Sequence, residues 1–254
     1  MHKSGFVNII GNPNVGKSTL MNALVGEKLS IITSKAQTTR HRIMGIVSGE
    51  DFQIVYSDTP GILKPSYKLQ ESMMKFVTGA VTDADVILYV TDTVEQGDRS
   101  AEIIGRIRES GIPTVVVINK IDLSTPEALD ALVDKWRQEL PEAQIVPASA
   151  KENFNIEGLF KTILALLPEG PAFYPKETLT DKTLRFFASE IIREKILKFY
   201  DKEIPYCCEI EIDSYREEPT IDRIAATIYV ARDSQKGILI GHKGEKLKRL
   251  GPNA

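Results

Sequence analysis

The sequence predicts an α/β fold, a mixed and mostly parallel six-stranded sheet with helices on both faces, followed by a smaller α+β domain. Three observations favour it. Strand-like and helix-like segments alternate through the first two-thirds of the chain. The segments 85–92 and 114–120 are near-continuous apolar runs, as expected of strands covered on both faces. A proline-containing stretch at 167–183 then separates this region from a different order of helices and strands.

Each element of the first region has a local signal. The strand at 5–10 ends in a glycine loop, and two β-rich runs within 42–58 are broken at 49–51, which is typical of a hairpin. The helix at 126–139 begins with Pro126, which a first turn tolerates. The other expected elements are a strand at 143–149 and helices at about 17–26, 67–80, 98–110 and 155–167. Strand, crossover helix and strand in succession predict a mainly parallel sheet.

The proline-containing stretch at 167–183 and the different order of elements after it predict a first domain at 1–168, a linker at 169–182 and a second domain at 183–254. The second domain begins with an amphipathic helix at 183–201, followed by strands at 208–213 and 224–230 and a helical segment at about 235–250. The apolar residues expected to share one face of its first helix are Leu184, Phe187, Ile191, Ile192, Ile196 and Phe199.

Composition is that of an ordinary soluble protein, with 42% hydrophobic and 26% charged residues and a net charge of −3. No apolar run approaches the ~20 residues that a membrane span needs, and no cleavage-like site follows the start, so we expect a cytosolic protein. Surface attachment to a membrane stays open. The adjacent Cys207 and Cys208 are expected to be reduced, and three scattered histidines show no metal spacing.

The segment GNPNVGKST at 11–19 fits G-x-x-x-x-G-K-[ST] and lies between an expected strand and an expected helix. Its glycines let successive backbone N–H groups point at phosphates, helped by the helix N-terminus. Lys17 is expected to reach the β- and γ-phosphates, and the Ser18 hydroxyl to bind Mg²⁺. The alternative for this segment alone is a chance glycine-rich turn. The residues expected to contact the nucleotide here are Gly11, Asn12, Pro13, Asn14, Val15, Gly16, Lys17, Ser18 and Thr19.

Three further signatures follow, each at the carboxyl end of an expected strand. In DTPG at 58–61, the Asp58 carboxylate can hold Mg²⁺ through water and the Gly61 N–H can sense the γ-phosphate. In NKID at 119–122, a buried Asp122 carboxylate can accept two hydrogen bonds that guanine offers and adenine does not. In SAK at 149–151, the Ala150 N–H can bind the guanine oxygen. The nucleotide contacts expected from these segments are Asp58, Thr59, Pro60, Gly61, Ile62, Asn119, Lys120, Asp122, Ser149, Ala150 and Lys151. Together the four signatures predict a guanine-nucleotide site.

Two features bear on the chemistry. In the loop at 34–42 we expect Thr39, rather than its neighbour Thr38, to close over Mg²⁺ and the γ-phosphate, which gives a metal set of Ser18, Thr39 and Asp58. Ile62 stands where many GTP-binding domains have a glutamine that orients the attacking water, and its side chain cannot form a hydrogen bond. We therefore expect Ile62 to take no part, and a backbone group to position the water.

The segment Gly241-His242-Lys243-Gly244 is a G-x-x-G turn of the kind found in KH domains, where the backbone passes close to nucleic-acid phosphates. A mere turn is the alternative for the motif alone. Residues from Gln235 onward carry five Lys or Arg against one acid, which is a local basic patch on an acidic protein. The residues expected to contact RNA are Ile240, Gly241, His242, Lys243, Gly244, Lys246, Lys248 and Arg249.

The segments GNPNVGKSTL, KAQTTRHRIMGI, DTPGI, NKID, PASAKE, TDKTLRFFASEIIREKI and GHKG resemble the Era family, bacterial Ras-like GTPases of the TrmE-Era-EngA-like group. The resemblance covers nearly the whole chain. It implies a P-loop GTPase domain followed by a type II KH domain, here expected to be incomplete at its C-terminus because the sequence stops at GPNA. It also implies that the protein is a monomer that hydrolyses GTP slowly with Mg²⁺. The resemblance further implies that the protein acts as a switch that binds the 3′ end of 16S rRNA in small-subunit assembly. A cytosolic location with some peripheral inner-membrane association is implied as well.

In some relatives a potassium ion held by a P-loop asparagine supplies charge to the transition state, and the matching residue here is Asn14. The resemblance thus implies a catalytic set of Lys17, Asn14, Thr39 and Gly61. The alternative is that Asn14 only braces the loop.

Three functions fit these patterns. The first is a GTP-hydrolysing switch that controls RNA binding. The second is a GTP-dependent switch for a membrane or protein partner, with RNA binding impaired by the incomplete KH domain. The third is a passive RNA-binding module with a structural nucleotide. The basic patch favours the first, and two loops expected to sense the γ-phosphate argue against the third.

Overall fold

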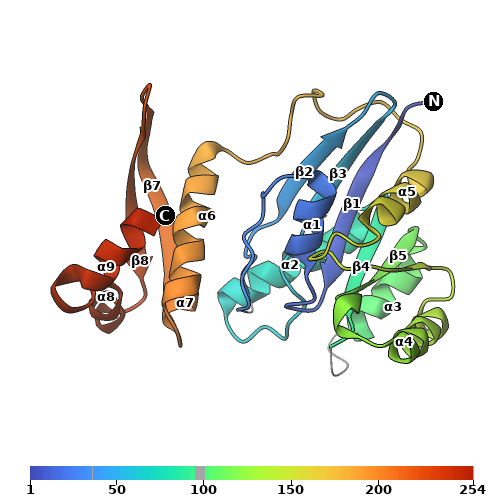
Figure 1. Cartoon of the computed structure of the whole chain (residues 1–254), viewed down its shortest axis with the longest axis horizontal. Coiled ribbons are helices and arrows are strands. Elements are labelled where there is room, and N and C mark those ends of the chain that lie inside the picture. Colours follow the sequence, from blue (N-terminus) through green and yellow to red (C-terminus); the bar gives the residue numbers. More distant parts are fainter. Residues whose placement is uncertain (36, 95–100, 254) are drawn as a thin grey trace. The chain divides into compact units, whose positions relative to one another are not determined.

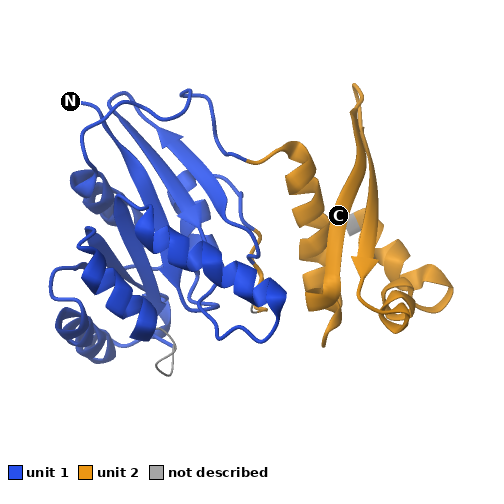
Figure 2. Ribbon diagram, turned by 180° about the vertical axis from the view of Figure 1, so that it is seen from behind, with its two compact units in different colours: residues 1–30, 39–181 blue, residues 31–38, 182–254 orange. Residues whose placement is uncertain are grey.

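The computed structural model describes residues 1–35, 37–94 and 101–253. The chain forms two compact units, shown in different colours in Figure 2. Unit 1 consists of Met1–Ser30 and Thr39–Asp181, and unit 2 of Ile31–Thr38 and Lys182–Ala254. The two units are described separately below.

Unit 1 is built on a six-stranded sheet with the order β2-β3-β1-β4-β5-β6 (Figure 1). The strands are β1 (Lys3–Gly11), β2 (Ile43–Ser48), β3 (Phe52–Asp58), β4 (Val86–Asp92), β5 (Thr114–Asn119) and β6 (Gln144–Pro147). The β2–β3 hairpin is antiparallel, and every other neighbouring pair is parallel. The prediction of a mixed, mostly parallel sheet is therefore confirmed.

Helices cover both faces of this sheet (Figure 1). They are α1 (Lys17–Val25), α2 (Lys68–Thr82), α3 (Ala101–Ser110), α4 (Pro126–Glu139) and α5 (Ile156–Leu166), with a 3-10 turn at Ile121–Leu123. Apolar residues of α2, α3 and α4 share one core with β4 and β5, in which the rings of Tyr89 and Trp136 lie 5.1 Å apart. Positions 98–100, the start of the helix predicted at 98–110, lie outside the described residues. Burial on both faces explains why β4 and β5 read as continuous apolar runs.

The strand register brings four loops to one edge of the sheet. Ile9 of β1 pairs with Asp58 of β3, Gly11 pairs with Val90 of β4, and Asp92 pairs with Asn119 of β5. The loops after β1, β3, β4 and β5 therefore begin at the same edge. In open α/β sheets, ligands bind outside the carboxyl ends of the strands, so this edge is where a site is expected.

The segment 169–181, within the predicted linker, lies along unit 1. The Tyr174 N–H donates to the Gln53 side chain (2.9 Å), and the Ile46 N–H donates to the Leu179 carbonyl (2.8 Å). The Thr180 hydroxyl donates to the Met44 carbonyl (2.6 Å). Backbone and side-chain bonds thus hold this segment against β3 and against β2, one of the two edge strands of the sheet.

Unit 2 is the smaller α+β domain. Its elements are α6 (Leu184–Phe199), α7 (Ile204–Cys207), β7 (Cys208–Glu217), β8 (Asp222–Val230), α8 (Asp233–Ile240), a 3-10 turn (His242–Gly244), α9 (Glu245–Leu250) and a final 3-10 turn (Gly251–Asn253). β7 and β8 form an antiparallel pair. Helix α6 begins where predicted because the Thr183 hydroxyl caps it, accepting a hydrogen bond from the Phe186 N–H (3.3 Å). The short helix α7 was not predicted, since four residues carry no periodicity.

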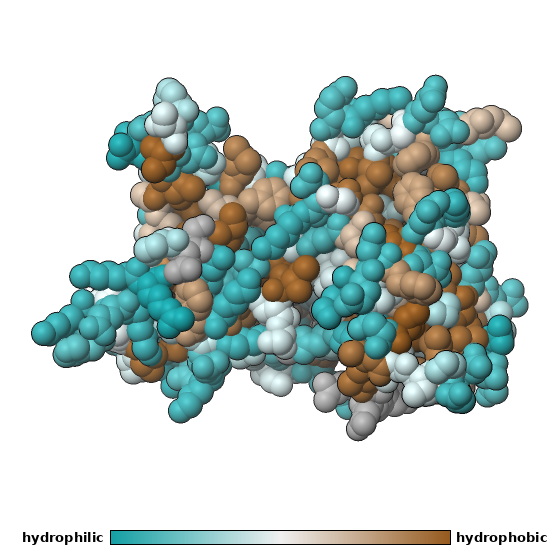
Figure 3. All heavy atoms as spheres, in the orientation of Figure 1, coloured by the Kyte–Doolittle hydropathy of each residue, from teal (hydrophilic) through white to brown (hydrophobic). Residues whose placement is uncertain are grey.

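The predicted apolar face of α6 is only partly covered by the rest of unit 2. Ile196 is buried in the core of unit 2, whereas Leu184 is 57% exposed and Ile191 is 42% exposed. Both line an apolar groove of about 610 Å³ between α6, β8 and α9. A sheet of two strands is too narrow to cover a four-turn helix. Brown, hydrophobic atoms reach the surface of unit 2 in Figure 3.

Among the described residues, no helix is both long and apolar enough to cross a membrane.

Candidate functional site

The phosphate-binding loop of unit 1 joins β1 to α1. Gly16 precedes α1 with a φ of 94°, in the left-handed region that glycine adopts without strain. A Cβ at this position would also lie 2.2 Å from the Asn119 amide nitrogen. The Lys17 side chain is buried and donates to the carbonyls of Gly11 (3.0 Å) and Asn12 (2.7 Å). The loop therefore curls around a buried ammonium group at the start of a helix.

Three oxygen-bearing side chains meet beside this loop. The Ser18 hydroxyl donates to Asp58 Oδ2 (2.7 Å) and lies 3.0 Å from the Thr39 hydroxyl, which is 3.3 Å from the same carboxylate oxygen. Thr39, and not Thr38, reaches this corner, because the Thr38 hydroxyl is hydrogen-bonded to Thr33 and to the Lys35 carbonyl (both 2.6 Å). The predicted metal set thus comes together from α1, the loop before β2, and β3.

The Asp58 carboxylate is fully buried, and its Oδ1 has no hydrogen-bond partner among the described residues. Burial raises the pKa of this carboxyl group, although the Ser18 hydroxyl and the Lys17 charge act in the opposite direction. A buried carboxylate oxygen without a partner is costly unless a cation or water meets it. Hydroxyl and carboxylate oxygens are the ligands that Mg²⁺ prefers, so the three side chains fit this metal.

The DTPG segment packs directly onto the phosphate-binding loop. A Cβ on Gly61 would lie 2.8 Å from backbone atoms of Pro13, so only glycine allows this approach. The Thr59 hydroxyl donates to the Ile9 carbonyl (2.7 Å), and the Ile62 N–H donates to the Gly11 carbonyl (3.1 Å). The Ile62 side chain is buried in the core shared by α2, α3 and α4. It therefore points into the protein interior, where no nucleotide can lie.

At the base-binding end, Asn119 holds two loops together. Its side-chain nitrogen donates to the Val15 carbonyl (2.8 Å), and its oxygen accepts from the Ala150 N–H (3.0 Å). The Ala150 N–H, which we expected to bind the guanine oxygen, is thus donated to Asn119 in this structure. The reason is that both groups are buried at the sheet edge, where a backbone N–H takes the acceptor that lies within reach.

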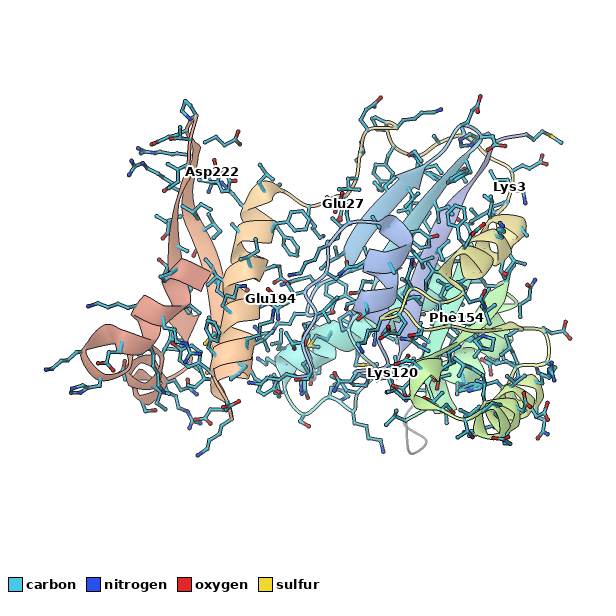
Figure 4. All side chains as sticks on the ribbon, in the orientation of Figure 1. Lys3, Glu27, Lys120, Phe154, Glu194 and Asp222 are labelled. Carbon is cyan, nitrogen blue, oxygen red and sulfur yellow. The ribbon has the colours of Figure 1, made fainter. Side chains whose placement is uncertain are left out.

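Lys120 lies at the end of β5 (Figure 4) and braces the phosphate-binding loop from the side. Its ammonium group donates to the Asn14 carbonyl (2.6 Å) and pairs with the buried Asp92 carboxylate (2.5 Å). The Asn14 side chain is exposed, and its backbone has a φ of 65°. Asp92 is a site residue that the sequence analysis missed. Its position at the end of the strand 85–92 was the available signal.

Two residues at the base-binding end differ from expectation. Asp122 was predicted as a buried carboxylate but is exposed, and its Oδ1 accepts from the Ser149 hydroxyl (2.5 Å). The 3-10 turn at Ile121–Leu123 places it on the surface. Lys151 points to solvent, where it pairs with Glu152 (2.9 Å) rather than with a neighbouring loop.

In unit 2, the G-x-x-G turn joins α8 to α9. Gly241 and Gly244 both have positive φ angles, 74° and 78°, and a Cβ on Gly241 would lie 2.7 Å from the Lys246 side chain. His242 and Lys243 are exposed between them. Hydrophilic side chains cover this end of unit 2 in Figure 3.

The other predicted RNA contacts lie on and beside α9. Lys246 and Arg249 lie over the rings of Tyr200 and Phe199, at 5.8 Å and 4.8 Å from the ring centroids, and both cations are exposed. Lys248 is exposed as well, and Ile240 is half-buried. The hydroxyl of Tyr200 donates to the Leu239 carbonyl (2.7 Å), which ties α6 to α8 beneath the turn. The unit therefore presents exposed cations around the turn.

Comparisons with known proteins agree for both units. Residues 6–120 match the family described as 50S ribosome-binding GTPase, and residues 203–254 match the KH domain family. The chain is 43% identical to the GTPase Era of Staphylococcus haemolyticus (strain JCSC1435), an alignment that covers 100% of this chain and 85% of that protein.

Two solved structures of Era superimpose on all or nearly all of the chain. One is Era in complex with MgGDPNP and nucleotides 1506-1542 of 16S ribosomal RNA, with a TM-score of 0.94, 40% identity, and 100% of this chain and 87% of that chain covered. The other is a variant of Aquifex aeolicus Era bound to GDP.AlF4-, with a TM-score of 0.92, 39% identity, and coverage of 99% and 87%. The phosphate-binding loop, the loops that converge on it and the G-x-x-G turn occur together in one chain that is 43% identical to a GTPase Era along its whole sequence, and this chain belongs to the Era family of GTPases.

Proposed function

We propose that this GTPase binds GTP with Mg²⁺ at the carboxyl edge of the unit 1 sheet and, in that state, binds the 3′ end of 16S rRNA through unit 2 during small-subunit assembly. The observation that carries the proposal is the joint presence of a site built to sense a γ-phosphate and a basic G-x-x-G turn. The relative that was solved with MgGDPNP and 16S rRNA nucleotides, with a TM-score of 0.94, supports the pairing of these two ligands.

Binding of the triphosphate rests on Lys17 and on the backbone N–H groups of the loop that precedes α1. The Lys17 ammonium, which bonds loop carbonyls in this structure, would turn to the β- and γ-phosphates. Ser18, Thr39 and Asp58 would hold Mg²⁺, which supplies positive charge beside the transferred phosphoryl group. These residues stabilise charge that develops on the phosphate oxygens.

In hydrolysis, a water oxygen bonds to the γ-phosphorus while the bond to the β–γ bridging oxygen breaks, releasing GDP and phosphate. The Gly61 N–H would contact the γ-phosphate, since Gly61 packs against the loop at Pro13. The buried Ile62 side chain supplies no group to the water, so a backbone group would position it. Hydrolysis without a side chain that orients the water is expected to be slow, as suits a switch.

Asn14 offers a second source of charge. Its side chain is exposed at the tip of the phosphate-binding loop, while Lys120 fixes its backbone carbonyl. We propose that this side chain holds K⁺ beside the β–γ bridging oxygen. Hydrolysis faster in potassium than in sodium, with the difference lost in Asn14→Ala, is the expected result, and equal rates in the two salts would leave Asn14 with a bracing role only.

RNA binding rests on the turn at 241–244 and the exposed cations of α9. Backbone N–H groups and Lys243 would contact phosphates, while unpaired bases would lie beside Ile240. A preference for unpaired RNA follows from this mode, since bases must be splayed away from a partner to reach the protein.

The test is the affinity of the chain for an RNA with the sequence of the 16S rRNA 3′ end, measured with a non-hydrolysable GTP analogue and with GDP. The ratio of the two affinities equals the differential affinity of RNA for the two nucleotide states, so a switch requires a ratio above one. A shuffled RNA of the same composition is the control. Equal affinities with both nucleotides, or equal affinities for both RNAs, would contradict the proposal.

A switch for a membrane or protein partner without RNA binding is not favoured, because the KH match and the basic turn have no role in it. Peripheral attachment to the inner membrane, a cytosolic location and a monomeric state remain part of the proposal. Vesicle flotation tests the first, cell fractionation the second and sedimentation the third.

A further inference from the structure

A cluster of polar side chains in unit 1 lies outside the nucleotide site and is centred on Arg42, the residue just before β2. Its Nε donates to the Ser57 hydroxyl of β3 (2.5 Å). Its Nη2 donates to Asn8 Oδ1 of β1 (2.9 Å) and to Asp83 Oδ1 at the end of α2 (3.1 Å), and its Nη1 also donates to the Asp83 carboxylate. One guanidinium thus joins three elements to the start of a fourth.

The partners of Arg42 are themselves fixed. Asn8 and Ser57 are fully buried. The Asn8 side-chain nitrogen donates to the Ala80 carbonyl (2.8 Å) and to Asp83 Oδ1 (2.7 Å), so both ends of its amide are used. The Arg42 side chain is 16% exposed, compared with 52% for Asp83. Only the planar fork of a guanidinium reaches these partners in one geometry, because a lysine ammonium is a single point of charge.

Helix stability does not account for the carboxylate in this cluster. Asp83 is the residue that caps the C-terminus of α2. The C-terminal end of a helix carries partial negative charge, so an acidic side chain there is unfavourable unless a cation offsets it. Arg42 provides that cation from the position between the Thr39 loop and β2. The pair therefore links two segments at the expense of the preferred charge at the helix end.

The cluster lies at the end of the Thr39 loop and at the far, C-terminal end of α2, the helix that follows the Gly61 segment. Arg42 is three residues after Thr39, and the next residue, Ile43, pairs with Asp58 in the β2–β3 hairpin. Ser57 immediately precedes Asp58 in β3. Helix α2 follows the segment that begins with Gly61, so its far end is held by Asp83 and Asn8. The loop around Thr39 and the helix after Gly61 are thus anchored to the same side chain.

We propose that Arg42 is a positioning residue for GTP hydrolysis, which clamps the end of the Thr39 loop and the C-terminus of α2 to the sheet. The clamp fixes the end of the Thr39 loop relative to α2, the helix that carries on from the Gly61 segment. Thr39 and the Gly61 N–H can then meet one γ-phosphate without a search through loop conformations. The guanidinium does not touch the nucleotide, so its effect is on the rate of the chemical step rather than on nucleotide affinity.

The experiment compares Arg42→Ala, Arg42→Lys and Asp83→Asn with the unaltered chain, by single-turnover GTP hydrolysis and GDP affinity. Arg42→Ala is expected to lower the hydrolysis rate roughly tenfold at saturating GTP while GDP affinity changes less than about twofold. Arg42→Lys keeps the charge without the fork and should lie between. The double variant Arg42→Ala/Asp83→Asn should be no slower than the slower single variant, because both changes break the same contact. Retention of GDP binding shows that each variant is folded.

Arg137→Ala is the matched control, because Arg137 is an exposed arginine of α4 that pairs only with Asp134 of its own helix among the contacts described. It should leave both quantities unchanged. A hydrolysis rate for Arg42→Ala equal to that of Arg137→Ala would overturn the proposal. A parallel loss of GDP affinity in Arg42→Lys, or effects that multiply in the double variant, would overturn it as well, since either result indicates a general structural role.

Discussion

The two glycine turns of this chain have very different surroundings. The turn at 11–18 is enclosed by loops from three other strands, and its Lys17 is buried with two hydrogen bonds. The turn at 241–244 joins two short helices, and its Lys243 points to solvent. The difference indicates that a glycine turn becomes selective for one ligand when loops from other strands surround it. On the proposed function, the first turn would choose its ligand by the base and the third phosphate, whereas the second would offer backbone and charge.

The comparison predicts its largest effect at Lys17. Lys17→Ala is expected to lower GTP hydrolysis by about a thousandfold or more, because a buried charge that stabilises the transition state is lost. Single-turnover hydrolysis measures it, with Lys161→Ala as the control, since that lysine pairs with Glu157 on the surface of α5. Hydrolysis that survives in Lys17→Ala would remove the contrast between the two turns.

The second effect concerns the choice of base. Asp122→Asn should lower GTP affinity by roughly a hundredfold and raise the relative affinity for xanthosine triphosphate. Xanthine has a carbonyl oxygen where guanine has its amino group, and the asparagine amide can donate a hydrogen bond to that oxygen. Competition between the two nucleotides measures the change, and Asp134→Asn on the surface of α4 serves as control. An unchanged preference for GTP would mean that the exposed position of Asp122 persists in the bound state.

A smaller effect is expected at the open turn. Lys243→Ala should weaken RNA binding only a few-fold and lower the slope of log affinity against log salt by about one unit, as for the loss of one phosphate contact. Titrations at several salt concentrations give both numbers, and the exposed Lys176 of unit 1 provides the control, as Lys176→Ala. A loss as large as that at Lys17 would show that the second turn is also a convergent site.

The smallest effect is one of stability. In the absence of Mg²⁺ and nucleotide, Asp58→Asn is expected to raise the free energy of unfolding by about 1 kcal/mol, because it removes a fully buried charge whose cost of burial exceeds the compensation from the nearby Lys17 charge. The same change should abolish Mg²⁺-dependent hydrolysis. Denaturant unfolding measures the gain, with the exposed Asp51→Asn as control. A loss of stability would mean that the Ser18 and Thr39 hydrogen bonds outweigh the cost of burial.

Most of the fold was predictable from sequence because most elements carry their own signal. The central strands β4 and β5 are continuous apolar runs, and Thr183 and Pro126 mark helix starts, whereas the four-residue α7 has no such signal. The site residues were predictable as a set because parallel strands bring their carboxyl ends to one edge. Their partners were not predictable. The end of the strand 85–92 pointed to Asp92, but no motif identifies Lys120 as its partner, and the sequence SAK does not indicate that Asn119 accepts the hydrogen bond from the Ala150 N–H.

Unit 2 shows the other limit of sequence analysis. Periodicity correctly places α6, but it cannot tell how much of the apolar face another element covers. Leu184 and Ile191 repeat like core residues and are nonetheless exposed beside the groove. The clamp at Arg42 was hidden for a related reason, since its partners come from β1, β3 and the end of α2, which are distant in the chain.

The segment at 169–181 has a practical consequence for any attempt to prepare unit 1 alone. An outermost strand presents unpaired backbone groups, and such an edge is a template for pairing with another molecule. Residues 179–181 occupy that edge along β2 through Ile46 and Met44. A fragment that ends at Pro168 is therefore expected to self-associate through β2. A fragment that ends at Asp181 retains residues 179–181 along this edge and is expected to stay monomeric.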